Sequence, residues 1–151
     1  MTRETYPDHT EAGALVTRLI LATFRTNGRL LRTGDQMVRD FGLTSGRWQV
    51  IAAIEDQPRS VAQIAREYEL SRQGVLWVVR TMIKDGMVIL VDNPEHRRAK
   101  LVKLTEKGRE AGNAVSELQV KWANAMGEAF TLRELKATIE CLERLGVVAV
   151  A

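Results

Sequence analysis

The chain has 151 residues and a mass of 16.9 kDa, which is the size of one compact domain. Its 45% hydrophobic and 27% charged residues are typical of globular proteins and exclude an intrinsically disordered chain. The net charge of +3 is too small to establish a nucleic-acid partner, so the distribution of charge along the chain has to decide that question.

The N-terminal part of the chain predicts one long helix over residues 12–41. Apolar residues recur there with rough helical spacing, while five arginines occupy the other faces. Gly28 and Gly34 are the positions where a kink is expected. Thr44 is a favourable N-cap for a second helix, which ends at about Ile54.

A third, short helix is predicted from a capping box. Ser60 and Gln63 have the spacing with which a hydroxyl and an amide satisfy each other's backbone amides, and the helix that they open reaches about Tyr68. The fourth helix follows the N-cap Ser71 and stops at Gly86, a residue suited to the left-handed conformation at helix ends.

The fourth helix has the clearest periodicity in the chain. Apolar residues at helical spacing predict its buried face: Val75, Val78, Val79, Met82 and Ile83. The residues between them predict the exposed face: Gln73, Leu76, Trp77, Arg80 and Lys84.

Two strands are predicted next, over residues 87–91 and 100–104, with a charged turn between them. Thr105 caps a fifth helix to about Phe130, and Thr131 with Glu134 forms a capping box for a last helix to about Leu145. The predicted fold is therefore mainly α, an α+β winged helix with six helices and a two-stranded wing. Residues 44–104 have the pattern of a winged helix-turn-helix.

Positive charge is concentrated in this central part. From Arg59 to Arg109 there are eleven basic and six acidic residues, a net charge of +5, so the remainder of the chain carries −2. Such a local excess is expected of a surface that contacts phosphates, although charged runs are also common on ordinary solvated faces.

Three stretches resemble the MarR (multiple-antibiotic-resistance regulator) family of bacterial transcription factors. The first is Gly42-Leu43-Thr44 followed by residues 47–51, similar to the family's second helix. The others are similar to its helix-turn-helix and to its wing with the start of the fifth helix: residues 61–65, 70–75 and 85–88, and residues 92–100 and 103–109. The resemblance covers almost the whole chain, and its motifs together, in order and spacing, are specific.

The resemblance implies a homodimer that places two recognition helices in successive major grooves of a pseudo-palindromic DNA operator, with each wing in the adjacent minor groove. We expect residues 1–41 and 105–151 to form the dimerisation helices and residues 42–104 to bind DNA. The predicted DNA-binding residues are Ser71, Arg72, Gln73, Leu76, Trp77, Arg80, Lys84, Arg97, Arg98 and Lys100.

The chemistry of these residues agrees with that assignment. Arg72 and Gln73 at the start of the helix can reach base edges, whereas Arg80 and Lys84 suit phosphates. Wing arginines such as Arg98 fit a narrow minor groove, because its negative potential attracts guanidinium groups.

Two features depart from the family. His96 stands where the family usually has an Asp that orients a wing arginine, and Asp92 or Glu95 are the candidates to replace it. Leu76 and Trp77 occupy exposed positions where the family commonly has polar or basic residues. Three interpretations of these two residues stay open: they contact thymine methyl groups, they cover a neighbouring element, or they bind a protein partner.

The family often binds small aromatic acids or phenolics between the dimerisation helices and the winged unit. The residues here that suit an anionic aromatic effector are Arg25, Arg29, Arg47 and Trp48. The competing interpretation is that Trp48 belongs to the core and that the arginines are ordinary surface charges.

The remaining features argue against catalysis and secretion. The sequence has no metal-ligand spacing, phosphate loop or nucleophile motif, so we expect neither an enzyme nor a cofactor or metal. The lone Cys141 cannot form an internal disulfide and is expected to be buried and unreactive on an apolar stripe. Without a signal-peptide pattern or an apolar run near the about 20 residues of a membrane span, a soluble cytoplasmic protein is expected.

We therefore predict a sequence-specific transcriptional regulator, a homodimeric repressor relieved by a small ligand. Two other functions stay open: a winged-helix protein-interaction module centred on Leu76 and Trp77, and a small-molecule sensor without an operator.

Overall fold

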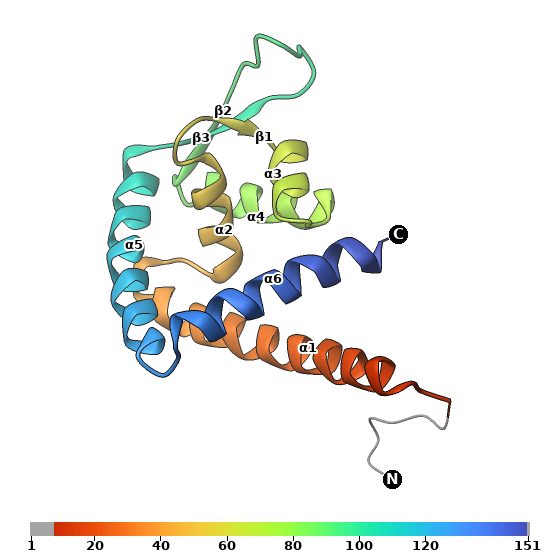
Figure 1. The fold of residues 1–151 in the computed structure, drawn as a ribbon. Coiled ribbons are helices and arrows are strands. Elements are labelled where there is room, and N and C mark those ends of the chain that lie inside the picture. Colours follow the sequence, from red (N-terminus) through yellow and green to blue (C-terminus); the bar gives the residue numbers. More distant parts are fainter. Residues whose placement is uncertain (1–7, 151) are drawn as a thin grey trace. The chain divides into compact units, whose positions relative to one another are not determined.

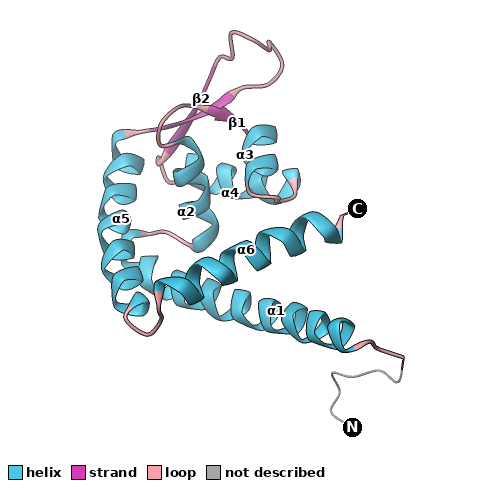
Figure 2. Cartoon of the chain, viewed as in Figure 1, coloured by secondary structure: helices cyan, strands magenta, loops and turns pink. Residues whose placement is uncertain are grey.

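Helices dominate the computed structural model, which describes residues 8–150 (Figure 1; Figure 2). The elements in chain order are α1 (Glu11–Val38), the 3-10 turn η1 (Arg39–Phe41), α2 (Ser45–Ile54), β1 (Arg59–Ser60), α3 (Val61–Glu67), α4 (Arg72–Lys84), β2 (Val88–Val91), β3 (Leu101–Leu104), α5 (Glu106–Gly127) and α6 (Leu132–Ala149). The six predicted helices and the predicted hairpin are present, which confirms the winged-helix fold class. None of the helices in residues 8–150 has the length and apolarity to cross a membrane.

Short-range side-chain chemistry sets the helix ends, as predicted. Thr44 caps α2 by accepting a hydrogen bond from the Arg47 amide at 3.2 Å. The pairs Ser60–Gln63 and Thr131–Glu134 form complete capping boxes for α3 and α6. Gly86 follows α4 with a φ of 71°, the left-handed region in which glycine is favoured.

The long first helix ends against the start of α2. It continues as a helix through Gly28 and Gly34 to Val38. A Cβ at Gly34 would lie 2.7 Å from Ser45 Oγ, so this glycine permits a close approach of the two helices. Ser45 then donates hydrogen bonds from Oγ to the Leu31 carbonyl at 3.1 Å and from its amide to Asp35 Oδ1 at 2.7 Å.

The sheet has three antiparallel strands in the order β1-β3-β2. The hairpin of β2 and β3 is the predicted one, with Leu90 opposite Val102 and Ile89 opposite Lys103. The sequence did not indicate β1, because it has two residues and its pairing partner is far along the chain, with Ser60 opposite Leu101.

The core of the winged unit lies between α2, α3, α4 and the sheet. Among its side chains with almost no exposed surface are Val50, Ile64, Val75, Val79, Met82, Val88 and Val102. The predicted buried face of α4 is confirmed at Val75, Val79 and Met82, and Val78 is half-buried. The prediction is wrong for Ile83, which is exposed because it stands at the edge of α4, beside a groove, rather than over the core.

The described chain separates into two compact units at Gly112 and Asn113, within α5. In the second unit α6 has no buried residue and runs to Ala149, past the predicted end at Leu145. The expectation of a buried Cys141 is wrong within one chain, because its thiol lies on this helix and is exposed. Large apolar side chains of α6 are exposed as well: Leu132, Ile139, Leu142, Val147 and Val148.

The start of α5 touches the backbone of the turn between α4 and β2. The Thr105 amide donates to the Met87 carbonyl at 3.0 Å, and a Cβ on Gly108 would lie 2.1 Å from that same carbonyl oxygen. A side chain at residue 108 would therefore push α5 away from this turn.

We expect Gly108→Ala to lower the free energy of unfolding by about 2–3 kcal/mol, because the added methyl group overlaps rigid backbone. The matched control is Gly28→Ala in α1, where the new Cβ meets only the end of the Arg32 side chain at 3.5 Å. That change should stabilise the chain by up to about 1 kcal/mol. Chemical denaturation measures both values, and equal effects of the two variants would contradict the close contact.

Candidate nucleic-acid interface

Helix α4 is held on three sides and exposed on the fourth. It packs against α2, α3 and β2. The turn that precedes it contains Glu69 in the left-handed region at a φ of 51°, and the Leu70 amide donates to the Ala65 carbonyl at 2.8 Å. Ser71 then caps α4 by accepting from the Gly74 amide at 3.0 Å. This is the helix-turn-helix that the sequence predicts.

The outer face of α4 presents the residues predicted to be exposed. Arg72, Gln73, Leu76, Trp77, Arg80 and Lys84 are all exposed, as is the cap Ser71. The two apolar residues differ, however. Trp77 is 68% exposed and lines a hollow of about 280 Å³ beside Gly46 and Gln49 of α2, whereas Leu76 is 37% exposed and faces the sheet.

The wing is the turn between β2 and β3, and it carries the three predicted cations Arg97, Arg98 and Lys100, all exposed. The Asn93 side chain shapes the turn by accepting from the Glu95 amide at 3.0 Å, and the Ala99 amide donates to the His96 carbonyl at 3.1 Å.

Asp92 does not replace the aspartate that the family uses to orient a wing arginine. Its carboxylate forms an ion pair with Lys100, and the hydrogen bond from Lys100 holds the pKa of Asp92 below its usual value. Among residues 8–150 neither Arg97 nor Arg98 pairs with a carboxylate, Glu95 included. The wing arginines are thus available to an external anion.

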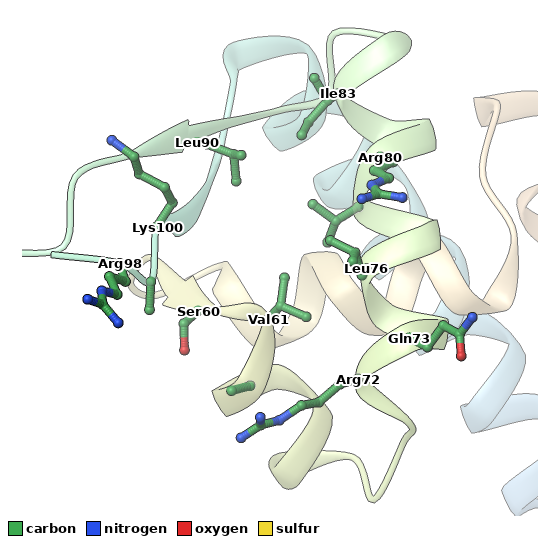
Figure 3. A pocket seen from close by; sticks show the side chains of 13 residues that line it. Ser60, Val61, Arg72, Gln73, Leu76, Arg80, Ile83, Leu90, Arg98 and Lys100 are labelled. Carbon is green, nitrogen blue, oxygen red and sulfur yellow. The ribbon is translucent and has the colours of Figure 1, made fainter. Parts of the chain in front are cut away.

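A groove, here called the helix–wing groove, separates α4 from the sheet and the wing (Figure 3). Its volume is about 600 Å³. The structure brings six of the predicted DNA-binding residues together around it: Arg72, Gln73, Leu76, Arg80, Arg98 and Lys100. Trp77, Lys84 and Arg97 do not line this groove.

The C-terminal end of α4 is fastened by contacts that the sequence did not reveal. Arg47 donates to Asp85 Oδ2 at 2.6 Å and to the Gly42 carbonyl at 2.8 Å. Lys107 Nζ donates to the Asp85 carbonyl at 2.8 Å, which places a second cation at the negative end of the helix dipole. Arg47 and Asp85 are 38 residues apart, so no local pattern connects them.

The predicted effector residues differ in exposure and in the contacts that they make. The guanidinium of Arg47 is engaged with Asp85, and its side chain is 16% exposed. Arg25 and Arg29 are exposed on α1, and Trp48 is half-buried on α2. Within the described part of the chain, no group of three or more His, Cys, Asp or Glu side chains is placed to hold a metal ion.

Comparison with known proteins places these features in a family. A family model described as the MarR family matches residues 41–99. The uncharacterized protein Rv2011c of Mycobacterium tuberculosis is 33% identical over 130 residues, which are 86% of this chain and 91% of the relative. The transcriptional activatory protein BadR of Rhodopseudomonas palustris is 26% identical over 137 residues, 87% of this chain and 78% of BadR.

Solved structures share the fold. The M. tuberculosis regulator MOSR in complex with DNA has a TM-score of 0.72 and 21% identity, covering 86% of this chain and 96% of MOSR. Staphylococcus aureus MarR in complex with salicylate and kanamycin has a TM-score of 0.74 and 17% identity, covering 90% of this chain and 93% of that protein.

The contact between Arg47 and Asp85 should stabilise the winged unit measurably. A double-mutant cycle with Arg47→Ala, Asp85→Ala and the double variant should give a coupling free energy of about 1 kcal/mol, since the arginine is mostly buried and also bonds a carbonyl.

The ion pair of Lys100 and Asp92 is the matched control for this cycle. Both of its side chains are more exposed, so the same measurement by chemical denaturation should give a coupling near zero. A coupling of Arg47 with Asp85 no larger than this control would show that the contact does not fasten α4.

Proposed function

This chain belongs to the MarR family of transcriptional regulators, and from that membership we propose that it binds a DNA operator as a homodimer through α4 and the wing. The family consists of regulators rather than enzymes. We further propose that the bound dimer represses transcription and that a small ligand releases it.

The observation that carries the proposal is the set of unpaired cations on one face of the winged unit. Arg72 and Arg80 on α4 and Arg98 on the wing have no ion-pair partner among residues 8–150. Unpaired arginines on a helix with a free outer face and on a neighbouring turn suit the phosphates and grooves of a DNA duplex.

Each group of residues has a proposed contact. Arg72 and Gln73, in the first turn of α4, read base edges in the major groove, beside the cap Ser71. Arg80 and Lys84 contact phosphates, and so does Lys100. Arg97 and Arg98 on the wing enter the minor groove, where A·T-rich sequences strengthen the attraction for a guanidinium group.

Trp77 is proposed to contact bases. Its high exposure does not fit the reading in which it covers a neighbouring element of the same chain. An indole facing the major groove can make apolar contact with thymine methyl groups, which gives sequence preference without hydrogen bonds.

Dimerisation is proposed for the terminal helices, with residues 1–41 and 105–151 as the dimer part and 42–104 as the DNA-binding part. The support is the apolar surface that one chain leaves exposed on α6, where Leu132, Ile139 and Val147 have no cover within their own unit. Burial against a second copy removes such surface from water.

The effector is proposed to be a small anion with an aromatic ring. S. aureus MarR is described in complex with salicylate, a molecule of this kind. In this chain the proposed ligand residues are Arg25, Arg29, Arg47 and Trp48. Of these, Arg47 also donates hydrogen bonds to Asp85 and to the Gly42 carbonyl.

The proposal predicts that selection of duplexes from a random pool by the purified protein recovers a palindromic motif. Its half-sites should be about one helical turn apart, because a symmetric dimer places its two recognition helices at that spacing. With about six phosphate contacts, affinity should fall by about 10³-fold between roughly 50 and 200 mM salt.

Two other results would point elsewhere. If binding to duplexes is salt-sensitive but no sequence motif is recovered, the protein does not recognise a specific operator and that part of the proposal is wrong. If the protein binds no duplex but binds another protein through Trp77, and salt does not weaken that contact, the protein-interaction module is favoured instead.

Trp77→Arg should change the selected motif at the positions that Trp77 contacts, because a guanidinium group prefers the acceptors of guanine over a thymine methyl group. The matched control is Ile89→Arg, which adds the same charge at an exposed site of β2 outside the proposed interface. The control should leave the motif unchanged. An unchanged motif in both variants would place Trp77 away from the bases.

A further inference from the structure

Five exposed arginines form a row, here called the arginine stripe, along one side of α1. The members are Arg18, Arg25, Arg29, Arg32 and Arg39. At about 100° per residue, all of them lie within about 40° of Arg25 around the helix axis. Because α1 is one continuous helix (Figure 1) and Arg39 keeps a helical backbone at its C-cap, the stripe is about 30 Å long. Net charge does not reveal it, since the chain outside residues 59–109 carries −2 in total.

The opposite side of α1 packs against the chain. Gly34 lies about 180° from Arg25 around the helix axis. A Cβ at Gly34 would meet Ser45 at the start of α2, and Val38, near the same side of α1, is fully buried. The arginine stripe therefore faces away from α2. It is a separate surface from the outer face of α4, which packs against α2 from another element.

The charge of the stripe is little compensated. Between its first and last arginine, the other positions in the same sector of the helix are Leu21 and Gln36, so no carboxylate interrupts the row. Arg29, Arg32 and Arg39 form no ion pair with a carboxylate in the described part of the chain. Such a row of positive charge attracts a polyanion.

The composition of the stripe favours the backbone of a DNA duplex over other polyanions. Protein interfaces are centred on aromatic or large apolar anchors, and single-stranded nucleic acids stack their bases on aromatic rings, but the stripe contains no aromatic residue. Arginine binds phosphate oxygens through two parallel hydrogen bonds. The length of the stripe is close to one turn of duplex, about 34 Å, and exceeds what a small ligand can cover.

We propose that the arginine stripe of α1 binds the phosphate backbone of a DNA duplex without regard to its sequence. Because the stripe faces away from α2, the duplex on it is a different segment of DNA from the operator on α4 and the wing. The protein then joins two segments of DNA. This second step rests on the proposed function, whereas binding by the stripe alone does not.

The first experiment separates the stripe from the operator surface. Its background is the full-length variant with Arg72→Gln, Arg80→Gln and Arg98→Gln, which lacks the unpaired arginines of α4 and the wing. The probe is a labelled random-sequence duplex of about 20 base pairs, two turns of DNA, followed by fluorescence anisotropy. This background variant should still bind the duplex, with an affinity that falls as salt rises.

Arg32→Gln with Arg39→Gln, added to this background, should weaken binding about tenfold or more. The slope of log K against log salt should fall by about 2, because each lost phosphate contact removes about one unit. Neither residue belongs to the proposed effector residues, so loss of an effector site does not explain the result. Arg32→Lys with Arg39→Lys keeps the charge and should retain most of the affinity.

The matched control is Arg133→Gln with Arg144→Gln, which removes the same charge from α6. These two exposed arginines also share one helix face, but Glu140 lies between them on that face, so they are not part of an uninterrupted cationic row. The control should bind the duplex as the background variant does. Circular dichroism checks that every variant keeps its helices.

Three results would overturn binding by the stripe. The first is a background variant that binds no random duplex, and the second is an equal effect of the α1 and α6 substitutions. The third is displacement of the labelled duplex by polyglutamate as readily as by unlabelled duplex at the same concentration of negative charge, which would make an acidic protein segment the occupant.

The second experiment tests whether the protein holds two duplexes at once. A biotinylated duplex with the selected motif is captured, and a labelled random duplex should be retained with it only when the protein is present. Arg32→Gln with Arg39→Gln in the otherwise unchanged protein should abolish this retention while the motif duplex stays bound. Retention unaffected by these substitutions, or none at all, would overturn the joining of two segments. Failure to select any motif would overturn the proposed function, and the first experiment would still judge the stripe.

Discussion

The carbonyl oxygen of Met87 lies so close to Gly108 that no side chain fits between the turn after α4 and the start of α5. Around this contact the Thr105 hydroxyl donates to the Gly86 carbonyl at 2.7 Å, and Lys107 donates to the carbonyl of Asp85. Three successive carbonyls after α4 are thereby bound by the first residues of α5 or its cap. These contacts tie the turn that follows α4 to the start of α5.

The helices were predictable because their signals are local. A hydroxyl at the N-cap, a glycine after the last turn and a stripe of apolar residues all act within a few residues of one another, so Thr44, Ser71 and Gly86 mark real boundaries. The exposed face of α4 follows from the same periodicity. Prediction therefore supplied the cationic residues of the candidate interface, together with the strand pair that carries the wing.

Contacts between distant residues were not predictable, because no spacing encodes them. Strand β1 exists through pairing with β3, about forty residues later, and the engagement of Arg47 with Asp85 depends on the packing of α2 beside α4. The buried state expected for Cys141 failed for a related reason. An apolar stripe predicts that a helix face is covered, but it does not tell what covers it. In this chain the apolar stripe of α6 is exposed.

Leu76 and Trp77 show how one residue step divides a helix face. Adjacent helical residues point about 100° apart, so two apolar neighbours in sequence need not form one patch. Here Leu76 joins the floor of the helix–wing groove, and Trp77 stands on the side of α4 nearer to α2. A single hot spot made from both is therefore a weaker interpretation than two separate contacts. The arginines that line the groove lie around the same space as Leu76. Trp77 instead projects from the helix with little of its surface covered, where a base or a partner protein can contact it.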